Sequence, residues 1–170
     1  ISGLFVGELE QAHRAAAELA RSLYAVPISR KADMVIASAG SAKNYVQSHK
    51  TLYNAYQAMK PGGRIVFVAP CEEGLGGEQI EKWLRLGSVD AIIAALRNQS
   101  EIYGQTALST REKAPSAIMV TELPEESVRL IGARKADNLD EALRIVRQEL
   151  TDDASYYVMP SASYTVPFYS

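Results

Sequence analysis

The sequence lacks most of the features that mark specialised classes of protein. It has one cysteine, Cys71, so an intrachain disulfide is excluded and a reducing compartment is favoured, which leads us to expect a cytoplasmic protein. Its longest apolar runs, such as residues 65–70 and 91–96, are far shorter than the ~20 residues that span a bilayer. The net charge of −2 gives no electrostatic argument for nucleic acid or an anionic membrane as a partner.

The chain also begins without a methionine and without the basic and apolar segments of a signal peptide, so we expect an excised piece of a longer protein. What is present is typical of a globular domain, since 47% of the residues are hydrophobic and 22% are charged. A length of 170 residues is enough for one well-packed domain and too short for two ordinary ones.

Short apolar segments alternate with amphipathic segments along the chain. Strands are predicted at residues 33–38, 64–69, 117–121 and 155–159. Helices are predicted at residues 8–24, 45–59, 78–84, 88–98, 105–113, 124–130 and 138–150. The second strand is apolar on both faces, which is typical of the centre of a parallel sheet. The pattern predicts a three-layer, Rossmann-like α/β fold with a mostly parallel sheet and helices on both faces.

We interpret the chain as one domain, 1–170. Residues 1–25 form a linker helix, residues 26–163 form the α/β core, and residues 164–170 form a disordered tail. Right-handed crossovers place the loops that follow the strands along one edge of the sheet, where ligands of such sheets bind. That edge is predicted to contain residues 39–47, 71–77, 122–123 and 160–164.

A glycine-rich loop, residues 72–77, connects the second strand to the next helix. Its glycines would let backbone N–H groups face an anion, and we single out Glu72, Gly74 and Gly76 as candidate cofactor contacts. The alternative is a tight turn between strand and helix. The loop is neither the GxGxxG dinucleotide fingerprint nor a Walker loop, because it has the wrong glycine spacing and no Lys-Ser/Thr pair.

Gln47 and Lys50 lie three residues apart at the start of a predicted helix on the ligand edge, so they share a helix face, while His49 points elsewhere. An amide beside an ammonium can hold a carboxylate or a keto oxygen. The alternative is ordinary solvated helix surface. His13, His49 and Cys71 do not have the spacing of metal ligands, so no metal site is predicted within the chain.

Several motifs, taken in order, connect the chain to a known family. The opening contains VGELEQAHR (6–14), YAVPI (24–28) and ADMVIAS (32–38). The remainder contains QSHK (47–50), KPGGRI (60–65), CEEGLG (71–76), YGQTA (103–107), ELP (122–124) and VMP (158–160). This ordered set runs over nearly the whole chain. It resembles the C-terminal domain of the nickel-dependent lactate racemases, with their Q-x-x-K helix, PGG turn and EGLG loop.

The resemblance implies a racemase of lactate or other small 2-hydroxy acids that uses a nickel pincer nucleotide as a hydride-accepting cofactor. It implies that the covalent lysine, the nickel-ligating histidine and the proton-shuttling histidines belong to a larger N-terminal domain. That domain would be the partner of this chain, which would be inactive alone. Gln47 and Lys50 match the Q-x-x-K residues. By resemblance, Lys50 binds the substrate carboxylate or the keto oxygen of the intermediate, and Gln47 orients it.

One stretch departs from the family pattern. Between Gly40 and Gln47 the family has a longer loop that resembles G-Y-P-x-D-x-N-L-Y, whereas this chain has SAKNYV (41–46). The change falls on the predicted ligand edge, so it bears on lactate as the substrate more than on the class of 2-hydroxy acids.

Two alternative interpretations of the sequence stay open. Residues 59–67 also resemble the LKPGGRLV segment of S-adenosylmethionine-dependent methyltransferases. A non-catalytic domain that regulates a partner domain would account for the same sequence.

Overall fold

A central five-stranded sheet organises the structure, a computed structural model that describes residues 1–169. In spatial order its strands are β5 (Arg134–Ala136), β4 (Ala117–Val120), β3 (Met59–Val68), β2 (Ala32–Ser38) and β6 (Tyr156–Met159). Every neighbouring pair in this sheet is parallel. Ile65, Val66 and Phe67 of the central strand are at most 1% exposed, because β3 meets side chains on both faces. The predicted α/β fold is confirmed.

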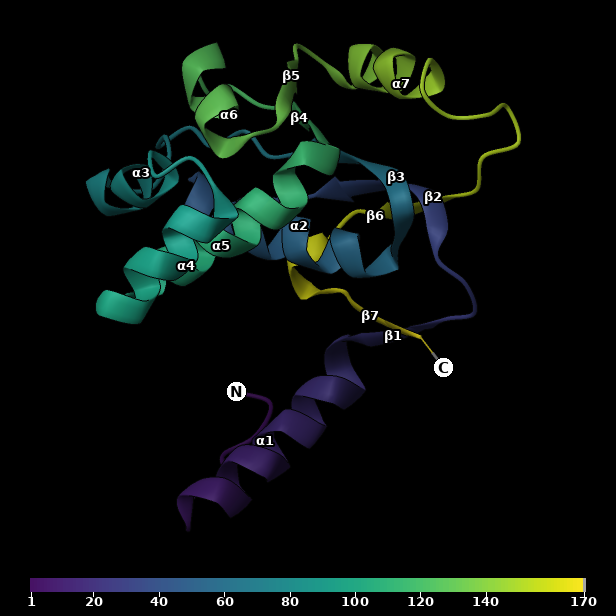
Figure 1. The fold of residues 1–170 in the computed structure, drawn as a ribbon. Helices are drawn as coiled ribbons and strands as arrows, with labels where there is room; N and C mark the ends of the chain where they lie inside the picture. Colours follow the sequence, from purple (N-terminus) through teal and green to yellow (C-terminus); the bar gives the residue numbers. More distant parts are fainter. Residues whose placement is uncertain (170) are drawn as a thin grey trace.

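Helices cover both faces of the sheet (Figure 1). The larger core lies on one face, beneath α2 (Tyr45–Ala58), α3 (Glu78–Leu84), α5 (Ile102–Lys113) and α6 (Glu125–Ile131), with α4 (Val89–Asn98) packed against α5. On the opposite face, α7 (Leu139–Arg147) packs Ala142 and Val146 onto Val66 and Ile118 of the sheet. Two 3-10 helices, η1 (Ala114–Ser116) and η2 (Ala162–Tyr164), precede β4 and follow β6.

The two ends of the chain pair with each other outside the main sheet. Strand β1 (Ala25–Ile28) runs parallel to β7 (Val166–Tyr169) and forms a two-stranded ribbon with it. The sequence prediction had a tail at residues 164–170, but residues 166–169 form β7; Ser170 lies outside the described residues. The partner of each strand lies at the other end of the chain, so a local pattern gives no signal for the pairing.

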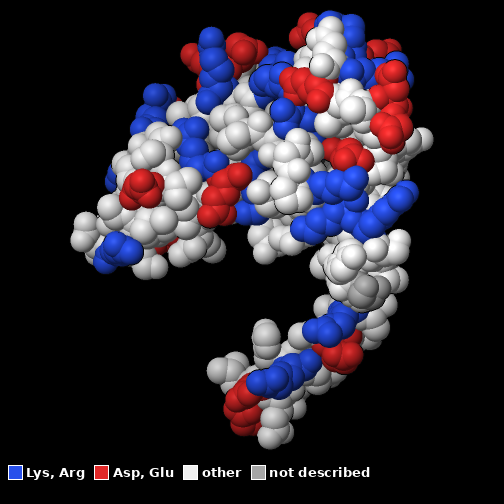
Figure 2. All heavy atoms as spheres, turned by 45° about the vertical axis from the view of Figure 1, so that its right-hand side comes forward, with Lys and Arg blue, Asp and Glu red and all other residues white. Residues whose placement is uncertain are grey.

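Helix α1 (Leu9–Tyr24) projects away from the body of the domain, and none of its residues is buried (Figure 1). Acidic and basic side chains alternate along it (Figure 2), and Glu10 forms a 2.7 Å ion pair with Arg14 one turn later. Within residues 1–169, α1 and the other helices are all too short or too polar to cross a lipid bilayer.

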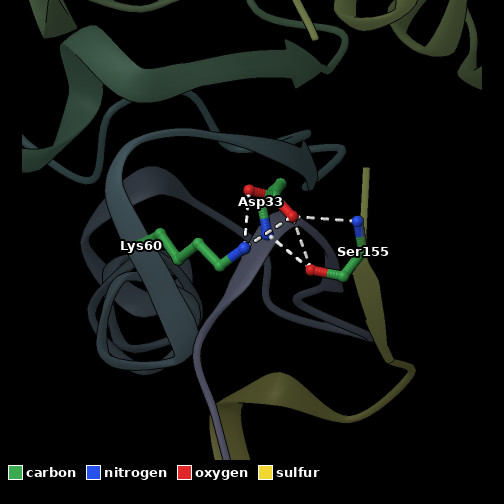
Figure 3. Close-up of polar contacts among 3 residues, drawn as sticks. All are labelled: Asp33, Lys60 and Ser155. Atoms are coloured by element: carbon green, nitrogen blue, oxygen red, sulfur yellow. Dashed lines mark hydrogen bonds and ion pairs between the residues drawn. The ribbon is translucent and has the colours of Figure 1, made fainter. Parts of the chain in front are cut away.

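A cluster of polar bonds ties three strands together at the amino end of the sheet (Figure 3). Both carboxylate oxygens of Asp33 accept from Nζ of Lys60 at 2.8 Å, which joins β2 to β3. The same carboxylate accepts from the backbone N–H and the hydroxyl of Ser155, at 2.9 and 2.5 Å, just before β6. These bonds hold the pKa of Asp33 far below its ordinary value, chiefly through Lys60. This cluster therefore lies at the end of the sheet that is opposite to the carboxyl ends of the strands.

Candidate functional site

The carboxyl ends of β2 and β6 open onto a cavity of about 450 Å³. These strands are neighbours in the sheet, so the segments that follow them form two walls of one space. The cavity is lined by residues 39–42 after β2, by Gln47 and Lys50 of α2, and by Ser161, Ser163 and Tyr164 after β6. Its volume lies within the range of ~300–1,000 Å³ that is usual for small-molecule sites.

The start of α2 is held by the glycine-rich loop. The N–H group of Tyr45 donates to the carbonyl oxygen of Gly74 at 3.0 Å. Asn44 caps the helix, since its Oδ1 atom accepts from the N–H group of Gln47 at 3.0 Å. Backbone N–H groups that begin a helix have no partner within it, and here they find partners in the loop and the cap. The loop therefore fixes the helix that lines the cavity.

The structure places Glu72, Gly74 and Gly76 in this loop, and they are not among the described residues that line the cavity. Glu72 is exposed, while the N–H group of Gly74 donates to the carbonyl oxygen of Cys71 at 2.8 Å. Gly76 has a φ of +100°, and a Cβ atom there would lie 2.9 Å from Oδ1 of Asn44. This glycine is required because loop and helix approach closely.

Helix α2 also holds the wall that follows β6. The hydroxyl oxygens of Thr51 and Ser163 lie 2.7 Å apart, and Nδ2 of Asn54 donates to the carbonyl oxygen of Ala162 at 2.7 Å. Thr51 is fully buried and Asn54 is 8% exposed, so both bonds are largely shielded from water. The segment that contains Ser161 to Tyr164 is thus fastened to the same helix as Lys50.

Sequence reasoning placed residues 160–164 on the ligand edge without giving them a role, and it missed Thr51 and Asn54. A signal was present, because Gln47, Thr51 and Asn54 follow at spacings of four and three, which puts three polar side chains on one helix face. A helix face that packs on a core is usually apolar. Polar residues on a buried helix face indicate hydrogen bonds to another segment.

Among the described residues that line the cavity, Lys50 alone carries a charge. The lysines that form ion pairs in the described chain are Lys43, Lys60 and Lys113, whereas Lys50 is exposed and has no carboxylate partner there. One turn earlier, Oε1 of Gln47 accepts from the Lys43 N–H group at 3.2 Å, which leaves the amide NH₂ group of Gln47 as a donor. The cavity therefore offers two adjacent donors and one positive charge, which suits a carboxylate or a keto oxygen.

His49 lies between these two residues in the sequence but is not among the described residues that line the cavity, which agrees with the prediction that it points elsewhere. Burial, together with the nearby Lys113 ammonium, lowers the pKa of His49 to about 4. Lys113 is itself 7% exposed, and its ammonium lies 5.2 and 5.4 Å from the ring centroids of Tyr53 and Tyr56. The imidazole is therefore neutral near neutral pH and belongs to the packing between α2 and α5.

Cys71 lies three residues after β3 and is a buried core residue. Its Sγ atom lies 3.5 Å from Oγ of Ser48, and burial raises the pKa of the thiol. A protonated, buried thiol is neither a good nucleophile nor a good metal ligand. Within residues 1–169, no group of three or more His, Cys, Asp or Glu side chains is placed to hold a metal ion.

The chain has counterparts among known proteins. A family model described as the lactate racemase C-terminal domain matches residues 28–164. A lactate racemase from Thermoanaerobacterium thermosaccharolyticum is 28% identical over 171 aligned residues, which cover 94% of this chain and 40% of that protein. The chain therefore spans well under half of the length of this relative.

Two solved structures share the fold. The lactate racemase apoprotein from Thermoanaerobacterium thermosaccharolyticum matches with a TM-score of 0.79 at 24% identity, over 94% of this chain and 40% of that one. A protein from Thermotoga maritima matches with a TM-score of 0.64 at 16% identity, over 95% of this chain and 42% of that one. Both structural matches extend over nearly the whole chain.

Proposed function

The chain belongs to the lactate racemase C-terminal domain family, and on this premise we propose that its cavity binds the 2-hydroxy acid substrate of a racemase. We propose that the other active-site residues lie in an N-terminal domain outside this chain. The coverage supports a second domain, since the chain corresponds to 40% of the lactate racemase that it resembles. The family assignment removes the methyltransferase reading of residues 59–67.

One observation carries the proposal: Lys50, without a counter-ion in the described chain, lies beside Gln47 in a cavity whose described lining contains no carboxylate. A substrate carboxylate would supply the missing negative charge. Every 2-hydroxy acid has a carboxylate next to the stereocentre that a racemase inverts. The positive charge of the cavity therefore suits the group that all these substrates share.

We assign Lys50 to the substrate oxygen that gains negative charge as hydrogen leaves carbon 2, or to the adjoining carboxylate. An ammonium fixed at that place favours the charged transition state over the neutral hydroxyl. Gln47 would donate from its amide NH₂ group to the same part of the substrate and so orient it. Toward the substrate, the glycine-rich loop acts indirectly, by holding the start of α2.

The nickel pincer nucleotide would supply a hydride acceptor when bound. The described side chains of this chain do not fit its nickel ion, because they offer no suitable set of ligands. The described residues provide no cluster of three His, Cys, Asp or Glu side chains, so we propose that the N-terminal domain holds the cofactor. Glu72, Gly74 and Gly76 remain proposed contacts to its edge. Because the N–H group of Gly74 is already bonded, the Glu72 carboxylate and the Gly76 N–H group are the better candidates.

Lys50→Ala in the intact, cofactor-loaded protein tests the proposal. We expect racemase turnover to fall by roughly 10²–10³, as for other charged or polar donors at developing negative charge, while the free energy of unfolding changes by only about 0.5 kcal/mol. Chiral chromatography measures the turnover, and thermal unfolding of the same sample measures the stability.

Lys43→Ala is the matched control, because Lys43 pairs with Glu73 on the exposed surface and its backbone contact to Gln47 survives the substitution. This variant should retain most of its activity. Wild-type turnover in Lys50→Ala would contradict the proposal and favour a non-catalytic, regulatory domain. We also expect the isolated 170-residue chain to fold and to show no racemase activity.

A further inference from the structure

The wall of the cavity beyond Lys50 and Gln47 is formed by small and hydroxyl-bearing residues. Ser41 follows β2, and Ser161, Ser163 and Tyr164 follow β6. The remaining described lining consists of Ala39, Gly40 and Ala42, so no Leu, Ile, Val, Met or Phe side chain is among it. An alkyl substituent of a substrate would thus meet the small side chains of Ala39 and Ala42 and, beside them, several hydroxyl groups. It would displace their water without offering hydrogen bonds in return, which is unfavourable.

The hydroxyl groups are available to a ligand. The carbonyl oxygen of Ser161 accepts from Oγ1 of Thr165 at 3.0 Å, whereas its hydroxyl, like that of Ser41, bonds to no group in the described part of the chain. Ser163 shares one hydrogen bond with Thr51, and a serine hydroxyl has one donor and two acceptor positions, so capacity remains there too.

The charge of the cavity lining and the volume of the cavity restrict the class of ligand further. Since Lys50 is the single charged residue in the described lining, one carboxylate is matched and a second would have no partner on this wall. A water molecule needs only roughly 10–15 Å³ of such space. The cavity of about 450 Å³ therefore has room for a substituent longer than the methyl group of lactate.

We propose that the substrate of this site is a monocarboxylic 2-hydroxy acid whose side chain carries hydroxyl groups, and that Ser41 and Ser161 select it over lactate. This inference rests on the proposed racemase function. Inversion breaks the bond between carbon 2 and its hydrogen and forms it again on the opposite face with the same electron pair. No net oxidant is consumed, and hydroxylated carbons further along the chain keep their configuration.

Lactate and glycerate form a matched pair of probes, because glycerate is lactate with one hydroxyl group added at carbon 3. The test measures kcat/KM for inversion of each acid by the intact, cofactor-loaded protein, with chiral chromatography as the readout. A longer pair, 2-hydroxybutyrate and 2,4-dihydroxybutyrate, is measured in the same way. We expect the hydroxylated member of each pair to be preferred by at least about 10-fold, because sites built to bond a hydroxyl reject analogues that lack it.

Two variants, Ser161→Ala and Ser41→Ala, test whether this wall causes the preference for the hydroxylated acids. Each should lower the ratio of glycerate to lactate kcat/KM by about threefold to tenfold, with melting temperature as the check on folding. Equal or better inversion of lactate by the unaltered protein would overturn this inference and leave the racemase function standing. If neither acid of either pair is inverted by the loaded protein, the racemase function is overturned and the inference falls with it. A preference for glycerate that both serine variants keep unchanged would also overturn the assignment to this wall.

Discussion

The hydroxyl oxygens of Thr51 and Ser163 lie 2.7 Å apart, and through this contact the helix that carries Lys50 also holds the opposite wall of the cavity. Asn54 reinforces the contact one turn later through the carbonyl oxygen of Ala162. Because Thr51 and Asn54 are buried and both bond to the segment after β6, these two hydrogen bonds set the distance between Lys50 and the serine wall.

Thr51→Val tests this contact, because valine keeps the shape of threonine and removes the hydroxyl. We expect the free energy of unfolding to fall by about 1 kcal/mol and KM for the substrate to rise, as the wall after β6 loosens. Asn54→Ala should cost more, about 1–3 kcal/mol, since it leaves the Ala162 carbonyl oxygen without its partner. Urea unfolding and steady-state kinetics give both quantities. Gln57→Ala, at an exposed position of α2, is the control, and an equal loss there would refute a specific role for Thr51.

Asp33→Asn should lower the melting temperature at neutral pH by roughly 2–4 °C, because the amide keeps the shape but cannot pair with the Lys60 ammonium. The pKa of Asp33 is lowered in the folded state. Its ionised carboxylate therefore stabilises the fold above the unfolded pKa near 3.8, and this stabilisation is lost as the pH falls below that value. The difference between wild type and variant should therefore shrink in acid. Asp153→Asn, an exposed neighbour, should show no such difference; if it does, general charge effects explain the result.

His49 makes the fold sensitive to mild acid. Its pKa is about 4 in the folded state and about 6.5 unfolded, so the unfolded chain gains a proton first and stability is lost as the pH falls from 6.5 toward 4. Between about pH 7 and pH 5 the loss should be about 2 kcal/mol. Nε2 of His49 has no partner in the structure, so His49→Leu should be tolerated at neutral pH and should remove this part of the acid sensitivity. Identical pH profiles of unfolding in both proteins would show that His49 is not responsible.

Gly104→Ala should destabilise the domain although alanine is the better helix former by about 1 kcal/mol. A Cβ atom at Gly104 would lie 2.6 Å from Cδ2 of Leu96 and 2.9 Å from Cζ3 of Trp83, which is buried beneath α5. Overpacking of this kind costs about 1–3 kcal/mol, so a net loss of about 1 kcal/mol is expected. Urea unfolding followed by the fluorescence of Trp83 measures it. A gain in stability would show that α5 shifts freely, and Gln105→Ala at the exposed neighbouring position provides the reference.

The sequence was sufficient for four of the five strands of the main sheet, because β2, β3, β4 and β6 are apolar segments that alternate with amphipathic helices. It was insufficient for β1, β5 and β7, which are short and are stabilised by partners that a local pattern does not include. Strand β3 also begins five residues earlier than predicted, at Met59. There Lys60 to Gly63 continue the strand through an irregular pairing with β2, which permits the bond between Lys60 and Asp33.

The candidate site was likewise predictable from the sequence only in part. Spacing alone placed Gln47 and Lys50 on one helix face, and strand order placed them beside residues 160–164. The bonds of Thr51 and Asn54 depend on a backbone more than 100 positions away in the chain, which no local pattern reveals.

The ribbon of β1 and β7 brings the end of α1 close to the wall of the cavity. Because the two strands are parallel, α1 and η2 enter the ribbon from the same end, and the ring centroids of Tyr24 and Tyr164 lie 6.1 Å apart. Thr165 alone separates η2 from β7. Through Tyr24, α1 therefore contacts a residue that lines the cavity, although α1 lies outside the five-stranded sheet and none of its residues is buried.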